Sequence, residues 1–428
     1  MTDTGTGTTG NRESVDGEAK FLRMASMRSI ELFTGAGGLA IGMARAGFNH
    51  EVVIEHDHDS CETIRLNQNR RIWPVVDWNL EAGEVERFDY GSIRSGIDLV
   101  AGGPPCQPFS LGGKHAGQKD DRNMFPQAVR AIRELHPRAF VFENVKGLLR
   151  EGFTKYFNYV LLQLEFPNCL RKTCEEWTDH HARLQRLKTQ GAYDDLRYNI
   201  VFDLLNAANY GVPQRRERVF IVGFRSDCME KWAFPKPTHS RDAFLEDLWI
   251  TGNYWVRHGI AKRERPQCDF RLLPCVERLR QQDVFSFLKP WRTVRDGIAG
   301  LPDPVRFKDS GIPNHVFNPG ARPYAGHTGS PIDEPAKTLK AGDHVVPGGE
   351  NMMLLPSGEV RYFTVRESAR LQEFPDDFVF YGSWTESMRQ IGNAVPVTLA
   401  EIVGKSIAGT LRNASHFGIT HVPIKRYA

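Results

Sequence analysis

The stretch RSIELFTGAGGLAIGMARAG occupies residues 28–47 and has the pattern of a strand, a glycine turn and a helix. Ser29 to Phe33 is a short β-prone run, Gly35-x-Gly37-Gly38 follows, and Leu39 to Ala46 has helical spacing. The glycines meet only the relaxed form of the dinucleotide fingerprint, because Ala40 stands where a third glycine is usual. The stretch therefore predicts the cofactor turn of an α/β fold, and it does not favour a dinucleotide.

The same alternation continues along the first half of the chain. Strands that alternate with helices indicate a mostly parallel sheet with helices on both faces. The further elements that we predict are strands at 52–54, 75–77, 97–101 and 139–142, helices at about 59–71 and 128–135, and a hairpin of 198–205 with 218–224 across Gly211-Val212-Pro213.

Acidic residues stand where two of these predicted strands end. Glu55 follows Gly35 by twenty residues, and a carboxylate there can hold the two hydroxyls of a ribose. Asp77 ends the predicted third strand and could meet an adenine. Together with the glycine turn, they predict a site for an adenosine-containing cofactor. Ordinary strand-end turns are the alternative.

Cys106 lies in the run GGPPCQPFS, residues 102–110, directly after a largely apolar stretch. Each proline fixes φ and stiffens the chain beside the sulfur. Open α/β sheets place reactive groups at the carboxyl ends of their strands. Cys106 is therefore a candidate nucleophile. The glycine-rich, charged segment 111–125 that follows predicts a loop able to close over a substrate, with a plain surface loop as the alternative.

Three other charged residues are candidates for chemistry. Glu143, followed by Asn144, comes after an all-apolar strand, where burial raises the pKa of a carboxyl group and suits it to carry a proton. Arg216 and Arg218 alternate along a predicted strand, so both face one side and form a surface for an anion or an oxygen atom. A core-rim carboxylate and surface salt bridges are the structural alternatives.

Composition limits the remaining possibilities. The 428 residues carry a net charge of +3, which is too weak to argue for a polyanionic partner by itself. The seven cysteines include no Cys-x-x-Cys, and no histidine follows the close pairs at zinc-ligand spacing, so we expect no metal and a reducing cytoplasm. No uninterrupted apolar stretch reaches the length of a membrane span.

The pattern changes after residue 224, where Pro, Gly, Trp and charged residues become frequent and periodicity weakens. Charged residues 167–197 predict an inserted helical segment. The organisation we expect is a disordered tail over 1–27, a catalytic and cofactor-binding domain over 28–224, a smaller irregular domain over 225–385, a return to the first domain over 386–412, and a C-terminal tail over 413–428.

Six sequence blocks together resemble the bacterial DNA (cytosine-5) methyltransferases of the restriction–modification type. They are ELFTGAGGL, GGPPCQPFS, FENVKGLL, QRRERVFIVGF, TVRESARLQEFPDDF and RQIGNAVP, and they occur in the family's order. The resemblance implies a Rossmann-like methyltransferase fold that uses S-adenosyl-L-methionine and no metal. It also implies that residues 225–385 are a target-recognition domain, in which 335–344 could contact the major groove of DNA.

The resemblance also assigns roles to single residues. It implies that Cys106 is the nucleophile, that Glu143 is the acid at ring nitrogen 3, and that Arg216 and Arg218 orient the base and the catalytic groups. The cofactor pocket would comprise Phe33, Gly35, Gly37, Gly38, Glu55, His56, Asp77, Trp78, Pro105, Phe125 and Asn393, and the substrate contacts would come from Gln107, Ser110, Asn144 and Arg366, with Arg366 helping to position the variable region.

Two positions differ from better-known members. His56 stands where an aromatic side chain often stacks on adenine, and Ala394 stands where a serine is common. Both concern the packing of the cofactor.

The implied reaction is methylation at carbon 5 of a cytosine that has flipped out of duplex DNA. We expect a cytoplasmic, DNA-associated, monomeric enzyme, with a restriction endonuclease that acts on the same site without touching it. The variable region resembles those of enzymes that act on GC-rich sites containing CCGG. A tRNA cytosine-5 methyltransferase and a non-catalytic DNA-binding regulator are the alternatives.

Overall fold

The computed structural model describes residues 27–105, 123–191, 193–229, 231–281, 286–308, 310–324, 327–341 and 351–416. Three predicted site residues, Cys106, Gln107 and Ser110, lie outside the described residues. So do almost all of the predicted closing loop, the N-terminal tail up to residue 26 and the end of the predicted groove-contact segment after residue 341.

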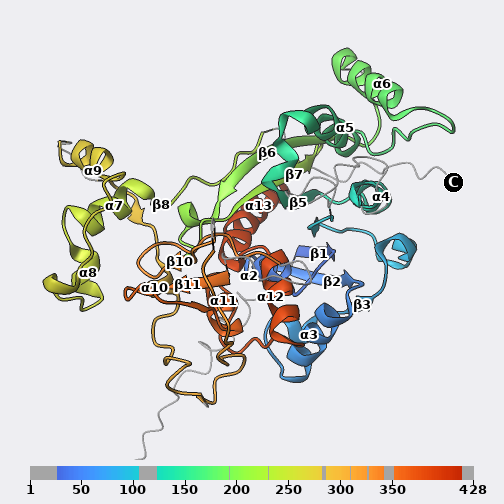
Figure 1. Cartoon of the computed structure of the whole chain (residues 1–428). Coiled ribbons are helices and arrows are strands. Elements are labelled where there is room, and N and C mark those ends of the chain that lie inside the picture. The colour runs from blue at the N-terminus through green and yellow to red at the C-terminus, as the bar shows by residue number, and fades with distance from the viewer. Residues whose placement is uncertain are drawn as a thin grey trace, which may run out of the picture.

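A seven-stranded sheet forms the centre of the molecule, in the order β3-β2-β1-β4-β5-β7-β6 (Figure 1). β1 to β5 run parallel, and β6 and β7 join one edge as an antiparallel hairpin. The strands are β1 (Met27–Leu32), β2 (Phe48–Glu55), β3 (Leu80–Ala82), β4 (Leu99–Gly102), β5 (Ala139–Val145), β6 (Tyr198–Asn206) and β7 (Glu217–Arg225). The mostly parallel α/β fold predicted from the sequence is confirmed.

Helices cover both faces of this sheet, as its two apolar faces require. On one face, α2 (Gly38–Arg45) and α13 (Val397–His416) pack over Leu99, Val141 and Phe220. On the other, α4 (Phe125–Leu135) and α5 (Thr154–Glu165) cover Ile30 and Phe142. The predicted inserted segment contains α6 (Trp177–Gln190), which packs against α5, and α3 (His58–Asn69) follows β2.

Two glycines bring the end of the chain against its beginning. A Cβ atom at Gly42 would collide with the Cβ of Ala400 on α13, and one at Gly38 would collide with the carbonyl oxygen of Val395. Only a glycine allows these close approaches. Residues 394–400 are thereby held over the first turn of α2, next to the glycine turn.

The predicted third strand is wrong. Residues Val75–Asp77 form a 3-10 turn, and the third strand is β3, five residues later. Val75 and Trp78 are buried while Val76 and Asp77 are exposed. Burial three residues apart is the spacing of a helical turn rather than the alternation of a strand.

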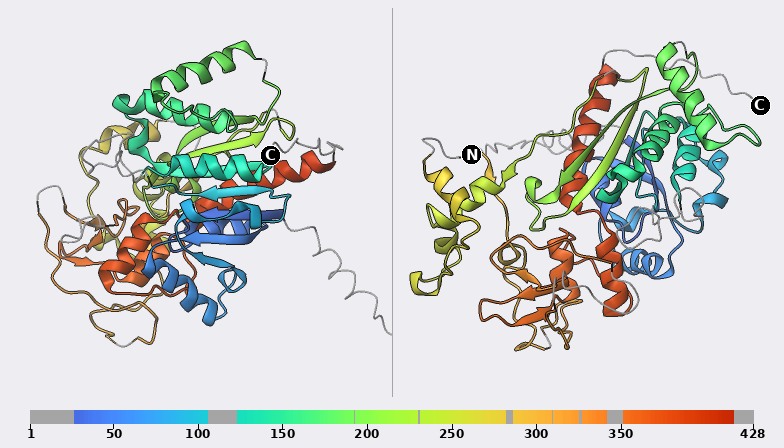
Figure 2. Two further views of the ribbon diagram at one scale, coloured as in Figure 1. Left: turned by 90° about the vertical axis from the view of Figure 1, so that its right-hand side faces the viewer. Right: turned by 45° about the horizontal axis from the view of Figure 1, so that its top comes forward.

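The region after β7 contains two parts. Helices α7 (Arg241–Trp249), α8 (Asn253–Arg257) and α9 (Leu273–Arg280) share a small core of their own, and this lobe stands out from the body of the molecule (Figure 1, Figure 2). The short parallel pair β8 (His239–Ser240) and β9 (Lys289–Pro290) joins the lobe to the body.

The second part packs onto the main body. Phe363 and Phe378 share one apolar cluster with Ile64 of α3 and with Val75. Among the described residues between 225 and 385, the lobe therefore has a core of its own, whereas the second part shares its core with the main body. The elements of this second part, with the last helix before α13, are α10 (Val294–Gly297), β10 (Ser330–Pro331), β11 (Met352–Leu354), β12 (Val360–Tyr362), α11 (Val365–Leu371) and α12 (Trp384–Asn393).

The end of the chain differs from the prediction in one respect. α13 runs to His416, so residues 413–416 continue the helix instead of beginning a tail. The stretch Trp384–Ala414 is long and apolar enough to cross a membrane by length and composition. Residues Leu399, Val403 and Ile407 of this stretch are fully buried against α2 and the sheet, so its apolar residues pack in the protein core.

Candidate active site

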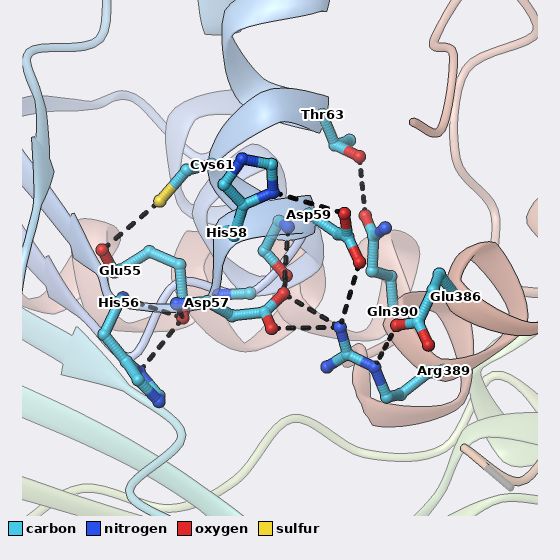
Figure 3. A network of polar contacts seen from close by, with 12 residues as sticks. Glu55, His56, Asp57, His58, Asp59, Cys61, Thr63, Glu386, Arg389 and Gln390 are labelled. Carbon is cyan, nitrogen blue, oxygen red and sulfur yellow. Dashed lines mark hydrogen bonds and ion pairs between the residues drawn. The ribbon is translucent and has the colours of Figure 1, made fainter. Parts of the chain in front are cut away.

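The glycine turn after β1 is fastened to Glu55, the last residue of β2. Glu55 Oε2 accepts a hydrogen bond from the Gly35 amide at 2.6 Å. Its other oxygen, Oε1, accepts from the amides of His56 at 2.9 Å and Asp57 at 2.7 Å, as Figure 3 shows for these neighbours. Three backbone donors thus fix the orientation of a nearly buried carboxylate at the carboxyl edge of the sheet.

A cavity of about 340 Å³ opens beside Glu55. It lies where β1 and β4 are neighbours, the point at which the strand order reverses and at which open α/β sheets bind ligands. Its lining residues are Phe33, Ile54, Glu55, His56, Gly83, Glu84, Val85, Glu86, Pro105 and Met124.

The cavity has carboxylate acceptors and an aromatic side chain, which suit an adenosine-containing group. A Cβ atom at Gly35 would meet nothing within 4 Å, so the turn faces open space. Phe33 lines the cavity with its backbone in the left-handed region, at φ 55°, a conformation that costs free energy in a non-glycine residue. Among the described residues, Glu55 Oε2 accepts only the Gly35 amide, so this oxygen has a lone pair left for a ribose hydroxyl.

His56 is an exposed wall of this cavity. Its Nδ1 lies 3.3 Å from Glu55 Oε1, and this hydrogen bond, against the cost of partial burial, raises the pKa of the imidazole. The position implied by the resemblance to stack on adenine thus holds a side chain that is partly charged near neutral pH.

Asp77 is not at this cavity. It precedes β3, whereas the cavity lies at the other end of the strand, where Ala82 pairs with Glu55. The acidic residues that line the cavity after β3 are Glu84 and Glu86, and Glu84 is the nearer to the end of the strand. Because the third strand was predicted too early in the sequence, the predicted adenine contact, Asp77, lies at the end of β3 away from the cavity.

Two other expected pocket residues, Trp78 and Phe125, have packing roles, and a third, Asn393, does not line the cavity. Trp78 is buried beneath the glycine turn, and a Cβ atom at Gly37 would approach its ring to 2.8 Å. Phe125 is buried in the core under the sheet, and its neighbour Met124 lines the cavity. Asn393 is exposed at the end of α12, and the next residue, Ala394, lies against Gly38.

The second part of the site is built on β5 and β7. Glu143 and Arg218 are diagonal neighbours across these antiparallel strands, with 2.8 Å between Glu143 Oε1 and Arg218 Nε. Both side chains are about nine-tenths buried. Burial raises the pKa of Glu143, and the Arg218 and Arg216 guanidinium groups only partly oppose this effect.

The chain leading to Cys106 runs directly past these groups. A Cβ atom at Gly103 would lie 3.4 Å from Glu143 Oε2, in ordinary contact. The Asn144 amide donates to the Pro104 carbonyl oxygen at 3.0 Å. Glu143 and Asn144 therefore adjoin the residues that immediately precede Cys106, and the Asn144 side chain positions this loop.

Arg216 is fully buried and joins three distant parts of the chain. Its guanidinium donates to the carbonyl oxygens of Leu339 at 2.9 Å and Gly392 at 2.6 Å. Burial, then repulsion from Arg218, lowers its pKa, and Glu143 opposes this. Arg216 thus links the strand that holds Arg218 to the variable region and to the end of α12.

Gln214 extends this link, and the sequence analysis did not identify it. Its Oε1 accepts from the Leu339 amide at 3.0 Å, and its Nε2 donates to the Leu371 carbonyl oxygen at 3.2 Å. The Ala336 amide donates to Pro213, and the Arg215 amide donates to Ala336. We call residues 336–340 the anchoring segment, because residues 213–216 hold it against the active site.

Arg366 does not face a substrate. It is fully buried, and it donates to the carbonyl oxygens of Pro313 at 3.2 Å, Pro375 at 3.0 Å and Phe378 at 2.6 Å. Because all three acceptors are backbone carbonyl groups, the buried guanidinium holds the segments around Pro313 and residues 375–378 together. The expected direct substrate contact is therefore replaced by a positioning role in the region after the lobe.

Comparison with known proteins adds a family to this geometry. The sequence matches the profile of the family described as C-5 cytosine-specific DNA methylase over residues 27–168, 178–260 and 307–409. Its gaps include residues 169–177, in the inserted segment, and 261–306, which contain α9 of the lobe; α7 and α8 lie within the match.

Curated relatives match most of the chain. The Type II methyltransferase M.NgoMIV of Neisseria gonorrhoeae is 31% identical over 388 residues, which are 90% of this chain and 98% of that protein. The Type II methyltransferase M.PspPI of Psychrobacter is 31% identical over 391 residues, which are 90% of this chain and 80% of that protein.

Solved structures share the fold. A DNA modification methyltransferase encoded within an Escherichia coli prophage aligns with 90% of this chain and 100% of its own, at a TM-score of 0.54 and 21% identity. The Dnmt2 methyltransferase of S. pombe aligns with 90% of this chain and 99% of its own, at a TM-score of 0.51 and 15% identity.

Proposed function

Because the chain belongs to the C-5 cytosine-specific DNA methylase family, we propose that it methylates carbon 5 of a flipped cytosine through a covalent bond to Cys106. The chain is a sequence-specific DNA cytosine-5 methyltransferase that uses S-adenosyl-L-methionine. The observation that carries the mechanism is the buried Glu143–Arg218 pair, which lies beside the two residues that lead into Pro105 and Cys106.

The chemistry needs a nucleophile and an acid together. Carbon 5 of cytosine is a poor nucleophile, so the Cys106 thiolate first adds to carbon 6 while Glu143 delivers a proton to nitrogen 3. The electron pair of the resulting enamine then makes carbon 5 nucleophilic. When bound, S-adenosyl-L-methionine supplies an electrophilic methyl group at this carbon. Loss of the carbon 5 proton to a base, with water as a candidate, expels the thiolate, and nitrogen 3 returns its proton to Glu143, which restores the neutral ring.

Burial gives Glu143 the properties of this acid. A raised pKa keeps a larger fraction of the carboxyl group protonated near neutral pH than in a solvated glutamate. Arg218 holds the side chain in place and stabilises the carboxylate that forms after proton transfer. The two arginines also bring positive charge to Glu143, and positive charge in this site would favour the thiolate of Cys106.

The cavity beside Glu55 is the proposed cofactor site. Glu55 would hold the ribose, Phe33 and His56 would flank the adenosine, and Glu84 would accept a hydrogen bond from the adenine amino group. Asn393, brought to the glycine turn by the contact between Ala394 and Gly38, would close the pocket from the end of the chain.

Glu84→Gln is expected to raise the KM for S-adenosyl-L-methionine by about tenfold, the effect of losing one charged hydrogen bond. Asp77→Asn, the matched change at the amino end of β3, should leave it within about twofold. Steady-state methylation with a varied cofactor concentration measures both. An Asp77 effect larger than that of Glu84 would return the adenine contact to Asp77.

The DNA would bind across the active site and the region 225–385, which we propose as the target-recognition domain. The longest gap in the family match, residues 261–306, contains the last helix of the lobe, α9, and a gap is expected where enzymes of different sequence specificity differ. The anchoring segment, bonded to Gln214 and Arg216, would fix the recognition elements relative to the active site.

Transfer of a tritiated methyl group from S-adenosyl-L-methionine to duplex DNA tests this function against the alternative of tRNA methylation. We expect label in duplex DNA and none in tRNA. Label in tRNA alone would overturn the assignment of the substrate. The large recognition region supports DNA, since single-stranded loops need less apparatus for the major groove.

The biological setting is also part of the proposal. The relatives are named Type II methyltransferases of bacteria, which supports protection of host DNA against a restriction endonuclease of the same specificity. We propose a monomer that acts on DNA in the bacterial cytoplasm, with no direct contact to that endonuclease.

A further inference from the structure

A second charged network lies behind the cofactor cavity, and its centre is Arg389 of α12 (Figure 3). One terminal nitrogen of Arg389 lies 3.1 Å and 2.9 Å from the two carboxylate oxygens of Asp57. Its Nε donates to Glu386 at 2.6 Å, and Asp59 lies 3.8 Å away. One guanidinium thus serves three carboxylates from two helices that are far apart in the sequence.

Asp57 connects this guanidinium to Glu55. It is the N-cap of α3, and its side chain accepts from the Ser60 amide at 2.9 Å and from the Ser60 hydroxyl at 2.7 Å. Its own amide donates to Glu55 Oε1 at 2.7 Å. The path from Arg389 to the proposed ribose-binding carboxylate therefore runs through one residue, by hydrogen bonds at both ends.

The neighbouring residue of α12 strengthens the same contact. Gln390 Oε1 accepts from the Thr63 hydroxyl of α3 at 2.6 Å, and its Nε2 donates to the Tyr381 carbonyl oxygen at 3.0 Å. The Thr63 and Gln390 side chains are both buried, so their hydrogen bond fixes the position of α12 relative to α3.

The charges at this contact depend on Arg389. Asp57, Asp59 and Glu386 are all acidic, and without the guanidinium they would repel one another across the helix contact. Burial raises the pKa of Asp57, but hydrogen bonds from Ser60 and Arg389 outweigh it, so the net pKa is lowered. The Asp57 carboxylate is therefore stabilised in its charged form by Ser60 and Arg389.

We propose that Arg389 is a positioning residue of the cofactor site, which fixes the Glu55–Asp57 turn and thereby aims the Glu55 carboxylate at the ribose. The inference rests on the proposed role of Glu55. α12 also ends at Asn393, so Arg389 sets the distance between two walls of the pocket that come from opposite ends of the chain.

A loss of Arg389 should weaken cofactor binding and spare the chemical step. Glu143 and Arg218 stand on β5 and β7, and none of the described contacts of Arg389 reaches either residue. Binding energy that is equal in the ground state and the transition state changes KM and leaves kcat unaltered.

The test compares Arg389→Gln with Arg65→Gln, which removes an exposed arginine of α3 that pairs with Glu62 at 2.6 Å. We expect Arg389→Gln to raise the calorimetric Kd and the KM for S-adenosyl-L-methionine about tenfold. The kcat at saturating cofactor and the Kd for DNA should stay within about twofold. Arg389→Lys should recover part of the lost affinity, and Arg65→Gln should change neither constant.

Asp57→Asn separates this role from general stability. Asparagine is as good an N-cap as aspartate, so the variant keeps the start of α3 and loses only the charge that Arg389 binds. If Arg389 acts through Asp57, the variant that combines Arg389→Gln with Asp57→Asn will bind the cofactor as weakly as whichever single variant has the higher Kd, and no more weakly. A double variant whose Kd is the product of the two single effects would overturn the proposal.

Two other outcomes would also overturn it. One is a lower melting temperature of Arg389→Gln with an unchanged Kd for the cofactor, and the other is a fall in kcat with an unchanged KM. Calorimetry with the cofactor alone needs no DNA substrate. An error in the substrate assignment would therefore appear in the methylation assay and leave the binding result intact.

Discussion

Cys106→Ala is expected to abolish methyl transfer, with a loss on the order of 10⁴-fold or more, the scale of removing a covalent nucleophile. Without the sulfur, no bond forms at carbon 6 and carbon 5 stays unreactive. Duplex DNA that contains 5-fluorocytosine should trap the wild-type enzyme, because fluorine cannot leave carbon 5 as a proton does. Mass spectrometry should then find protein joined to methylated DNA, and no adduct with the variant.

Cys174→Ala is the matched control, since Cys174 is an exposed free thiol on the inserted segment. It should retain full activity and form the adduct. An adduct that persists in Cys106→Ala, or that disappears in Cys174→Ala, would contradict the assignment of the nucleophile.

Glu143→Gln is expected to lower kcat by about 100-fold or more, which corresponds to about 2.7 kcal/mol of transition-state stabilisation. Glutamine keeps the size and much of the hydrogen bonding of the side chain but cannot give up a proton to nitrogen 3. The Kd for S-adenosyl-L-methionine should stay near the wild-type value, because Glu143 does not line the cofactor cavity. Glu165→Gln provides the control, because Glu165 is also buried and paired with a base, Arg197, but lies on α5.

The pH dependence of kcat follows from the direction of the Glu143 shift. The acid must be protonated to act, so activity should fall as the pH rises through its raised pKa, and this limb should shift or vanish in Glu143→Gln. The fall should lie above the ordinary range of a solvated glutamate. A profile in which the limb is identical in the two proteins would remove the proton-donor role.

Most of the sheet could be predicted from the sequence because its strands are short apolar runs that end at polar residues. The runs that end at Glu55 and Glu143 are of this kind, and both residues lie where the prediction placed them, at the carboxyl ends of β2 and β5. Parallel strands buried on both faces have little alternation, so the apolar run itself carries the signal.

The third strand could not be predicted in the same way. The pair Val75–Val76 has the higher strand propensity, but the sheet uses Leu80–Ala82, a three-residue edge strand with little hydrophobic signal. The acidic residues that line the cofactor cavity after this strand are accordingly Glu84 and Glu86 and not Asp77. A glycine before Glu84 is the one local sign of the turn that begins there.

Buried polar contacts between distant segments were also beyond the sequence. Arg366 belongs to a helix with a capping box at Thr364, yet nothing local shows that three carbonyl groups surround its guanidinium. The contacts of Gln214 with Leu339, and of Arg389 with Asp57, join residues 125 and 332 positions apart. Such pairs depend on the tertiary packing of the whole chain, and no periodicity reports them.

The central claim is that this chain methylates cytosine in a short DNA sequence by means of Cys106. Bisulfite sequencing of DNA from a methylation-free bacterial host that expresses the chain, beside a host that expresses Cys106→Ala, tests it most directly. The account predicts cytosines protected from conversion, all within one short motif, and none in the control. The absence of any protected cytosine, with a folded protein that binds S-adenosyl-L-methionine, would contradict it.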